Sequence, residues 1–491
     1  MSHLLGIAHD AVGWTLPHAT LCVFALFLIR VVARRWWSPL RQVPGPWLAA
    51  YTRLWKLYHT SRDNMELVNI DLHRRYGPIV RIAPHEVSID DPEDSLRVIY
   101  GHGTRFTKSR WYEASDPPGG HSLFTDPDIK RHAHERRMVA SGFSMSALLE
   151  MEDFVSECVK VFETRMNEFA ESGQALDMAH WLQCYAFDVI GEITFAKRFG
   201  FMDRGEDVGN TIQTLEGFLS YSAKMGVLPE LHAPYSRLKS LLFPGSAPLE
   251  TVGEFAVKAV EDRKRAGAEH RDLVSRFLQT HEEKPGEFPM SEVYKMCTVM
   301  IGAGSDTTAI ALRAVVYFLC KNPEKLSKLR SELDVAESDG RLSEPITYAE
   351  AMSLPYLQAV LKEAMRLHPS TGFTMARVVP KGGTVLLGHS LPEGTTVGIN
   401  SWVAHRNEDV FGPDVESFIP ERWLRSEEFG SGSRTCLGKN ISVMEMSKLI
   451  PQLIRHFHIQ LVHPDRPWKT TNWWLVKQAD MDCYVSQRRK A

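Results

Sequence analysis

A long apolar segment, Val293–Phe318, constrains the fold of this chain most strongly, because its pattern predicts one helix that Asn322-Pro323 ends. Other helical patterns cover Met65–Tyr76 and much of residues 145–333, with Gly and Pro clusters near 226–229 and 244–248. Short alternating or apolar runs at 78–90 and 378–397 predict small sheets. We therefore expect a mainly α fold with small β-sheets.

The middle of the long segment, residues 302–308, is polar and contains two glycines. A glycine inside a helix costs about 1 kcal/mol relative to alanine, and a buried acid without a partner is also costly. One interpretation is a bend, with Asp306 facing solvent and the hydroxyls bonded to preceding carbonyls. The other is a functional site, where chemistry overrides folding preferences. The pattern alone leaves both open.

A turn-rich loop, Phe429–Gly438, surrounds Cys436 and precedes a helix-like stretch, Ile441–Ile454. Its glycines allow the backbone to approach a flat cofactor closely. A nearby helix start stabilises a thiolate, and Arg434 has the geometry to pair with a cofactor carboxylate. Taken alone, the loop pattern fits a structural turn with a buried thiol equally well.

The full spacing Phe-x-x-Gly-x-Arg-x-Cys-x-Gly, together with the run Ala303–Thr308, resembles the cytochrome P-450 superfamily. The resemblance implies a triangular, helix-rich haem domain that binds heme b (iron protoporphyrin IX), with the Cys436 thiolate as the iron ligand. Such a ligand favours cleavage of the O–O bond. In this reading Thr307 and Asp306 are catalytic: Thr307 would hold water at the oxygen-binding site and Asp306 would relay protons. The implied cofactor-binding residues are Cys436, Arg434, Phe429, Gly438, Arg136, His132 and Arg377.

Further positions match the family by spacing. Glu363 and Arg366 lie on one helical face, where an isolated pair on the surface would stabilise little. The resemblance implies that they form a buried triad with Arg422, which supports the cysteine loop. Arg136 and Arg377 match family positions that contact haem propionates, and arginine suits such contacts. Each of these two, taken alone, is more often a solvated arginine.

The amino-terminal segment predicts a single uncleaved membrane helix. Its apolar run, Ala19–Ile29, needs flanking residues to span a bilayer, and Arg30, Arg34 and Arg35 follow it, with no Lys or Arg before. By the positive-inside rule the start faces the lumen and the remainder is cytosolic. A signal peptide is disfavoured by this charge order, and a buried core helix is the other rival. We expect residues 1–40 to be the membrane anchor and hinge approach, and 41–491 the haem-thiolate catalytic domain at the endoplasmic reticulum membrane.

Charge and cysteine content limit the partners and the compartment. The net charge is -3 with scattered basic residues, so no nucleic-acid partner is expected. The seven cysteines include no Cys-x-x-Cys pair, which argues against a disulfide framework or structural zinc and favours free thiols in a reducing compartment.

Function follows from the resemblance, which is greatest to fungal microsomal members of the pisatin demethylase type in secondary metabolism. It implies a monooxygenase that inserts one atom of O2 into a lipophilic small molecule. Electrons would come from NADPH–cytochrome P-450 reductase, docked through basic residues such as Lys439, with cytochrome b5 as a further candidate donor. The substrate pocket residues expected from family positions are Trp111, Phe124, Ile301, Ala303, Phe373 and Trp474.

One segment departs from the family pattern. Only five residues, Leu424–Glu428, separate Trp423 from Phe429, fewer than the family meander carries. We expect this shortening to weaken haem binding, which keeps open a haem-deficient splice form or a non-catalytic haem-binding or scaffold protein. A haem-thiolate isomerase or lyase that needs no reductase is a further alternative, although Asp306 and Thr307 argue against it.

Overall fold

The computed structural model describes residues 18, 21, 22, 25, 29, 37–243, 248–266, 271–424 and 435–488. This part of the chain is mainly helical with small β-sheets, which confirms the expected fold class. The expected membrane helix lies largely outside the described residues, as do Phe429, Arg434 and most of the short meander.

The helices before residue 290 are α2 (Trp47–Tyr51), α3 (Leu54–Ser61), α4 (Met65–Tyr76), α5 (Asp94–Tyr100), α6 (Ile129–Val139), α7 (Met145–Leu149), α8 (Glu152–Ser172), α9 (Met178–Phe195), α10 (Phe201–Arg204), α11 (Thr211–Met225), α12 (His232–Leu242), α13 (Pro248–Ala266) and α14 (Leu273–Glu283). The later helices are α15 (Met290–Lys321), α16 (Pro323–Ser338), α17 (Tyr348–Met352), α18 (Pro355–Leu367), α19 (Ser401–Ala404), α20 (Glu408–Phe411) and α21 (Lys439–His456). Short 3-10 helices are η1 (Arg110–Ser115), η2 (Ala140–Phe143), η3 (Val208–Asn210), η4 (Pro229–Leu231) and η5 (Pro420–Leu424).

Four small sheets complete the described fold. The largest has the strand order β1-β2-β8-β5-β3, in which β2 and β8 are parallel and the other neighbours antiparallel. A second has the order β4-β12-β9, and β6–β7 and β10–β11 are antiparallel pairs. The strands are β1 (Ile79–Ala83), β2 (Glu86–Ile89), β3 (Thr107–Lys108), β4 (Leu176–Asp177), β5 (Arg377–Val378), β6 (Thr384–Leu386), β7 (His389–Leu391), β8 (Thr396–Ile399), β9 (Phe457–Leu461), β10 (Lys469–Trp473), β11 (Leu475–Ala479) and β12 (Asp482–Gln487).

Helix α15 is the predicted apolar helix, and it ends where the Asn-Pro pair predicts. Asn322 caps it with a side-chain hydrogen bond to the Phe318 carbonyl (2.7 Å), and Pro323 begins α16. Among the described helices, α15 is the one long and apolar enough to cross a membrane, but 72% of its most hydrophobic window is buried. Since its surface is covered by protein, α15 is a core helix.

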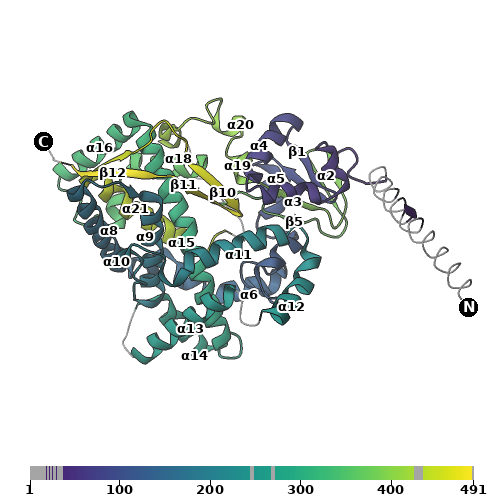
Figure 1. Ribbon diagram of the computed structural model, residues 1–491, viewed down its shortest axis with the longest axis horizontal. Helices are drawn as coiled ribbons and strands as arrows, with labels where there is room; N and C mark the ends of the chain where they lie inside the picture. Colours follow the sequence, from purple (N-terminus) through teal and green to yellow (C-terminus); the bar gives the residue numbers. More distant parts are fainter. Residues whose placement is uncertain are drawn as a thin grey trace, which may run out of the picture.

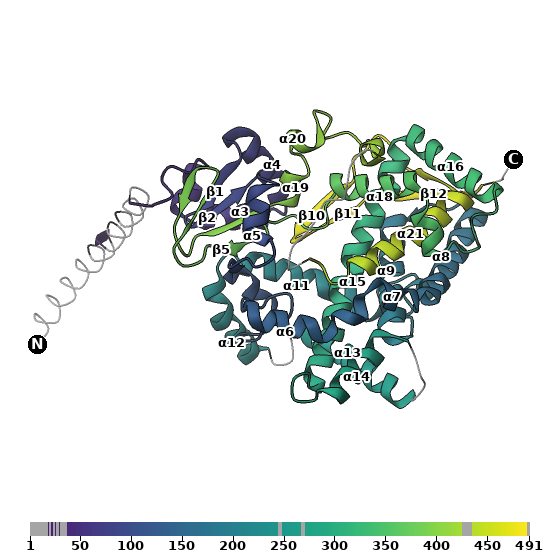
Figure 2. The same ribbon diagram turned by 180° about the vertical axis from the view of Figure 1, so that it is seen from behind.

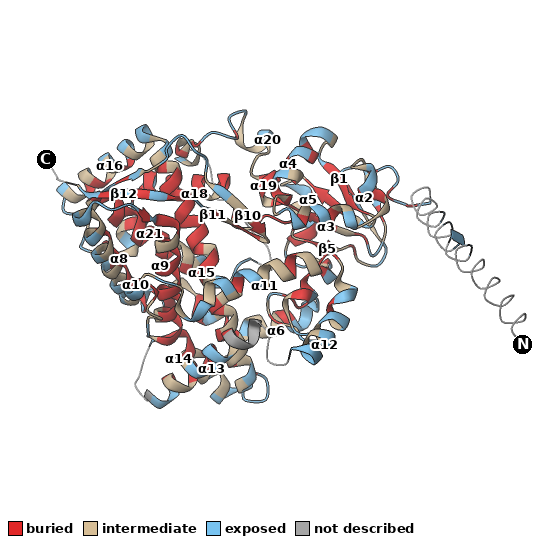
Figure 3. Ribbon diagram, in the orientation of Figure 1, coloured by how far each residue is buried: buried red, intermediate tan, exposed pale blue. Residues whose placement is uncertain are grey.

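Helices α9, α13, α18 and α21 pack against α15. Figures 1 and 2 show the largest sheet and α2–α5 at one end of the molecule, and α8, α16 and β12 at the other. Buried residues follow α9, α15, α18 and α21 through the interior (Figure 3). This packing brings the cysteine before α21 and the polar middle of α15 into the same region.

Candidate active site

Ala303 and Thr307 lie on an exposed face in the middle of α15. Ala303 is exposed and Thr307 half-buried, whereas Ile301, Ser305 and Asp306 are buried. Solvent-accessible space therefore lies against this face of a core helix. The Thr307 hydroxyl donates to the Ala303 carbonyl (2.9 Å), and the Ser305 hydroxyl to that of Ile301 (2.8 Å). The predicted back-bonding of hydroxyls is thus confirmed.

Asp306 points the other way, into the protein. Gln183 Nε2 on α9 donates to its Oδ1 at 2.5 Å, and Lys477 Nζ on β11 lies 3.0 Å from its Oδ2. Arg313 Nη2 donates to Gln183 Oε1 at 2.6 Å, which fixes the orientation of the amide. The interpretation in which Asp306 faces solvent is wrong, because the carboxylate is buried and has found buried partners.

The two glycines before Asp306 differ in how closely other helices pack on them. A Cβ on Gly304 would lie 2.7 Å from Ile190 Cδ1 on α9, closer than side chains pack. A Cβ on Gly302 would lie 3.5 Å from Leu215 Cδ2, an ordinary contact. Glycine at 304 is therefore explained by close packing of α9 on α15.

Cys436 is an exposed, free thiol a short way before α21. Arg136 Nη2 on α6 donates to the carbonyl of Thr435 at 2.8 Å and so fixes the backbone next to the cysteine. A Cβ on Gly438 would meet nothing within 4 Å, so the described protein gives no steric reason for glycine there. Open space beside Gly438 is what a flat cofactor above the loop needs.

A hydrogen bond joins the cysteine side of the site to α15. The hydroxyls of Thr308 and Ser442 lie 2.8 Å apart, and Ser442 lies near the start of α21, the helix that follows Cys436. Farther along α21, burial raises the pKa of Glu445 well above its ordinary value, and no described residue hydrogen-bonds its carboxyl oxygens. Sequence reasoning did not single out this neutral buried acid.

Arg377 and His132 are both buried. Arg377 Nη1 donates to the Tyr112 hydroxyl (3.2 Å) and to the Ala376 carbonyl (3.0 Å), and its guanidinium lies 5.1 Å from the Tyr100 ring. His132 lies on α6, one helical turn before Arg136, so both occupy one face.

The structure brings Glu363, Arg366 and Arg422 together. Glu363 is fully buried and accepts from Arg366 Nε (2.8 Å) and Nη2 (2.9 Å) and from Arg422 Nε (3.0 Å). The Trp423 indole (2.8 Å) and the Ile419 amide (2.9 Å) donate to the same carboxylate. Arg366 also donates to the carbonyls of His405, Val415 and Ser417. The group ties α18 to the segment that leads toward the cysteine loop, and Trp423 is a member that the sequence motif did not indicate.

Four of the six expected pocket residues form one aromatic cluster. Trp474 has ring centroids 4.9 Å from Trp111, 5.9 Å from Phe124 and 6.4 Å from Phe373. Tyr112, which sequence reasoning missed although it adjoins Trp111, lies 5.3 Å from Phe124 and 6.1 Å from Trp474. The remaining two lie on α15: Ala303 on the exposed face and Ile301 in the main core, apart from the cluster.

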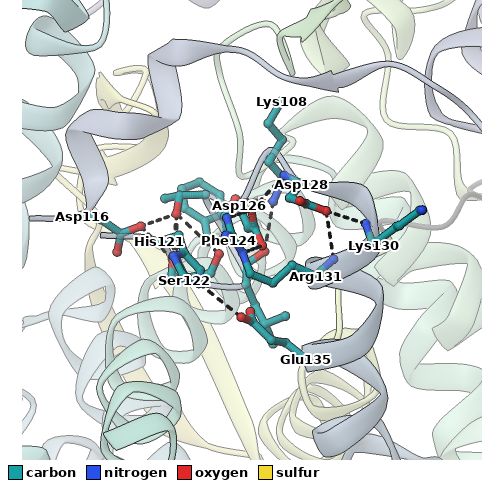
Figure 4. A network of polar contacts seen from close by, with 12 residues as sticks. Lys108, Asp116, His121, Ser122, Phe124, Asp126, Asp128, Lys130, Arg131 and Glu135 are labelled. Carbon is teal, nitrogen blue, oxygen red and sulfur yellow. Dashed lines mark hydrogen bonds and ion pairs between the residues drawn. The ribbon is translucent and has the colours of Figure 1, made fainter. Parts of the chain in front are cut away.

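Polar contacts fix the loop that carries Phe124 (Figure 4). Lys108 Nζ donates to the carbonyls of Leu123 (3.0 Å) and Phe124, and Arg131 holds Asp126 with two hydrogen bonds of 2.8 and 2.7 Å. Burial by itself would raise the pKa of Asp126, but Arg131 and a backbone amide lower it below its usual value. Phe124 is therefore presented by a cross-linked loop, and 37% of it stays exposed.

These residues fit a haem. An exposed thiol before a helix can act as a thiolate ligand, and Arg136 hydrogen-bonds the backbone carbonyl beside it. The open space beside Gly438 and Ala303 gives the ring room.

The fold and this site define a haem-thiolate enzyme. The family described as Cytochrome P450 matches residues 43–482, and the chain belongs to that family. It is 39% identical to a pisatin demethylase of Fusarium vanettenii over 95% of this chain and 93% of that protein. It is 36% identical to the cytochrome P450 monooxygenase cicH of Emericella nidulans over 92% of this chain and 95% of that protein. The chain is accordingly a P450 monooxygenase whose haem has an axial cysteine thiolate, with relatives in fungal secondary metabolism.

Proposed function

We propose that Cys436 is the axial ligand and that the enzyme oxidises a lipophilic aromatic small molecule. The observation that carries the ligand assignment is the exposed thiol of Cys436 just before α21, the helix whose Ser442 hydrogen-bonds Thr308 on α15. The other described cysteines are at least half-buried, apart from Cys22 in the amino-terminal segment. Arg136 and Arg377 would hold the propionates, with His132 beside them.

The bound haem supplies oxygen activation, in which O2, two electrons and two protons give one inserted oxygen atom and one water. The part of this chain is to position substrate and protons. The Thr307 hydroxyl, on the exposed face, would hold a water molecule, and the Asp306 carboxylate, once released from Gln183 and Lys477, would exchange protons with it. The Glu363 triad would hold the backbone beneath the cysteine rather than contact a reacting group.

The reduced, carbon-monoxide-treated spectrum tests the ligand assignment. We expect a strongly red-shifted Soret band for the wild type and its loss in Cys436→Ser, because serine supplies no thiolate. Cys320→Ser is the matched control, since Cys320 is a half-buried thiol elsewhere in the chain. A red-shifted band retained in Cys436→Ser would disprove the assignment.

Oxygen insertion requires electrons from outside, and we propose NADPH–cytochrome P-450 reductase as their source, with cytochrome b5 as a second donor. Turnover under labelled O2 with reductase and NADPH should place one labelled atom in product. Product formation without NADPH, and without label, would instead indicate an isomerase or lyase.

The aromatic cluster supports the substrate class. Rings of Trp111, Phe124 and Trp474 offer edges and faces to a planar guest, and aromatic pairs add stabilisation beyond buried area. Titration with pisatin, the compound in the relatives' name, and with lauric acid tests this idea by the shift of the Soret band. We expect the shift with the aromatic probe and a weaker one in Phe124→Ala. Equal responses to both probes would refute the aromatic preference.

We also propose single-pass attachment to the endoplasmic reticulum membrane. Exposed apolar side chains occur on α2, α3 and α12, including Trp47, Leu54 and Leu241. Arg53 after α2 pairs with Glu230 in η4 (3.0 Å), directly before α12, so these elements lie on one side of the molecule. The full chain should sediment with microsomes in carbonate, and recovery in the supernatant would refute attachment by a spanning helix.

A further inference from the structure

Lys477 on β11 lies between two acids from different helices. Its Nζ is 3.0 Å from Oδ2 of the buried Asp306 and 3.3 Å from Oε1 of Glu216 on α11. The Lys477 side chain is 13% exposed and that of Glu216 is 52% exposed. One ammonium thus connects an acid inside the core to an acid at the surface.

The two oxygens of Asp306 are held differently. Oδ1 accepts the hydrogen bond from Gln183, which Arg313 orients. Oδ2 has the Lys477 ammonium at ion-pair distance but makes no hydrogen bond of good geometry. Its attraction to Lys477 is therefore mainly electrostatic, and Oδ2 keeps a lone pair available for a proton.

The helix that supplies Glu216 covers the site. Leu215, its neighbour on α11, lies beside Gly302 of α15. Toward the end of α11, Ser222 donates to the Ala114 carbonyl in η1 (3.1 Å), and Gly226 packs against the Trp111 ring. A displacement of α11 would move Glu216 away from Lys477 and uncover the aromatic cluster at once.

We propose that Lys477 is a positioning residue through which the docking of α11 controls how firmly Asp306 is held. A second carboxylate beside an ammonium repels the first and so offsets part of the attraction that the ammonium exerts on it. With α11 docked, Glu216 offsets part of the attraction of Lys477 for Asp306, and Asp306 is released to exchange its proton with water at Thr307. With α11 displaced, Lys477 pairs with Asp306 alone and retains it. This inference rests on the proposed roles of Asp306 and Thr307.

Amide exchange tests the connection without any turnover. In the full-length holoenzyme, Glu216→Gln and Lys477→Met should each speed exchange in residues 211–225 by about threefold, the size expected for a partly exposed ion pair. Lys469→Met is the control, since Lys469 pairs with Asp480 (2.7 Å) on the same hairpin at the surface. Exchange unchanged in both test variants, or accelerated equally in the control, would overturn the proposal.

Release of hydrogen peroxide tests whether Glu216 and Lys477 affect proton delivery. With reductase and NADPH and no added substrate, poor proton delivery raises the fraction of NADPH recovered as hydrogen peroxide. Glu216→Gln should raise this fraction about threefold in the wild type and leave it unchanged in a Lys477→Met background, because the effect passes through Lys477. An equal rise in both backgrounds, or none in the wild type, would overturn the proposal.

The carbon monoxide spectrum distinguishes failure of the Lys477 proposal from failure of the proposed function. A thiolate signature in every variant, together with unchanged peroxide release, refutes the coupling and leaves the proposed function standing. No thiolate signature in the wild type refutes the proposed function, and the assigned role of Lys477 with it.

Discussion

Replacing Glu363 with glutamine should destabilise the fold strongly. The carboxylate is fully buried and accepts five hydrogen bonds, three of them from arginine nitrogens. Removing one partner of a buried ion pair costs about 3–5 kcal/mol, because the other charge is left uncompensated. Arg366 keeps its three carbonyl acceptors, at 2.7 to 3.1 Å, so we expect the lower end, about 3 kcal/mol.

Guanidinium unfolding followed by far-ultraviolet circular dichroism measures this loss. With a denaturant dependence of about 6 kcal/mol/M, the midpoint should fall by about 0.5 M. Glu416→Gln is the matched control: Glu416 also contacts two arginines, Arg74 and Arg406, but is 55% exposed, so its midpoint should fall by less than about 0.2 M. Equal shifts in the two variants would refute the argument that burial makes the Glu363 group important.

Three further outcomes follow from the structure and the sequence. A family-length meander inserted between Trp423 and Phe429 should raise haem bound per chain, and unchanged occupancy would show that the short segment is not limiting. Burial lowers the pKa of His73 to about 4, below the ordinary 6.5 of an unfolded chain, so its neutral ring contributes stability that is complete above pH 6.5 and declines as the pH falls toward 4. At pH 5 the free energy of unfolding is lower by about 2 kcal/mol for this reason. His73→Asn should therefore make the unfolding midpoint depend less on pH between pH 7 and 5, and an unchanged pH dependence would contradict this. Gly304→Ala should cost about 1–3 kcal/mol through the clash with Ile190, measured as a lower unfolding midpoint that Ile190→Val partly restores, whereas a wild-type midpoint would contradict the packing explanation.

Local patterns were sufficient to predict much of the fold. The periodicity of Met65–Tyr76 and the Asn322-Pro323 stop match α4 and the end of α15, because both depend on neighbouring residues. The triad was also accessible, since two of its members are one helical turn apart and the third follows a Pro-Glu-Arg motif.

The surroundings of Asp306 were not predictable in this way. Gln183 precedes it by more than a hundred residues, Lys477 follows it at a still larger separation on a strand, and neither belongs to a motif. The same limit applies to Gly304, because the residue that explains a glycine there, Ile190, lies on another helix. Tertiary packing decides these contacts, and a single sequence does not record which helices meet.

The exposure of Ala303 on an otherwise buried helix bears on how such an enzyme changes over generations. A larger residue at 303 would extend away from the core, toward the space proposed for the haem and its substrate, and would leave the core around Ile301 and Asp306 intact. The volume offered to a guest can thus be altered by single substitutions at little cost in folding. Descendants of one gene can therefore diverge in the compounds they accept while their interior stays the same.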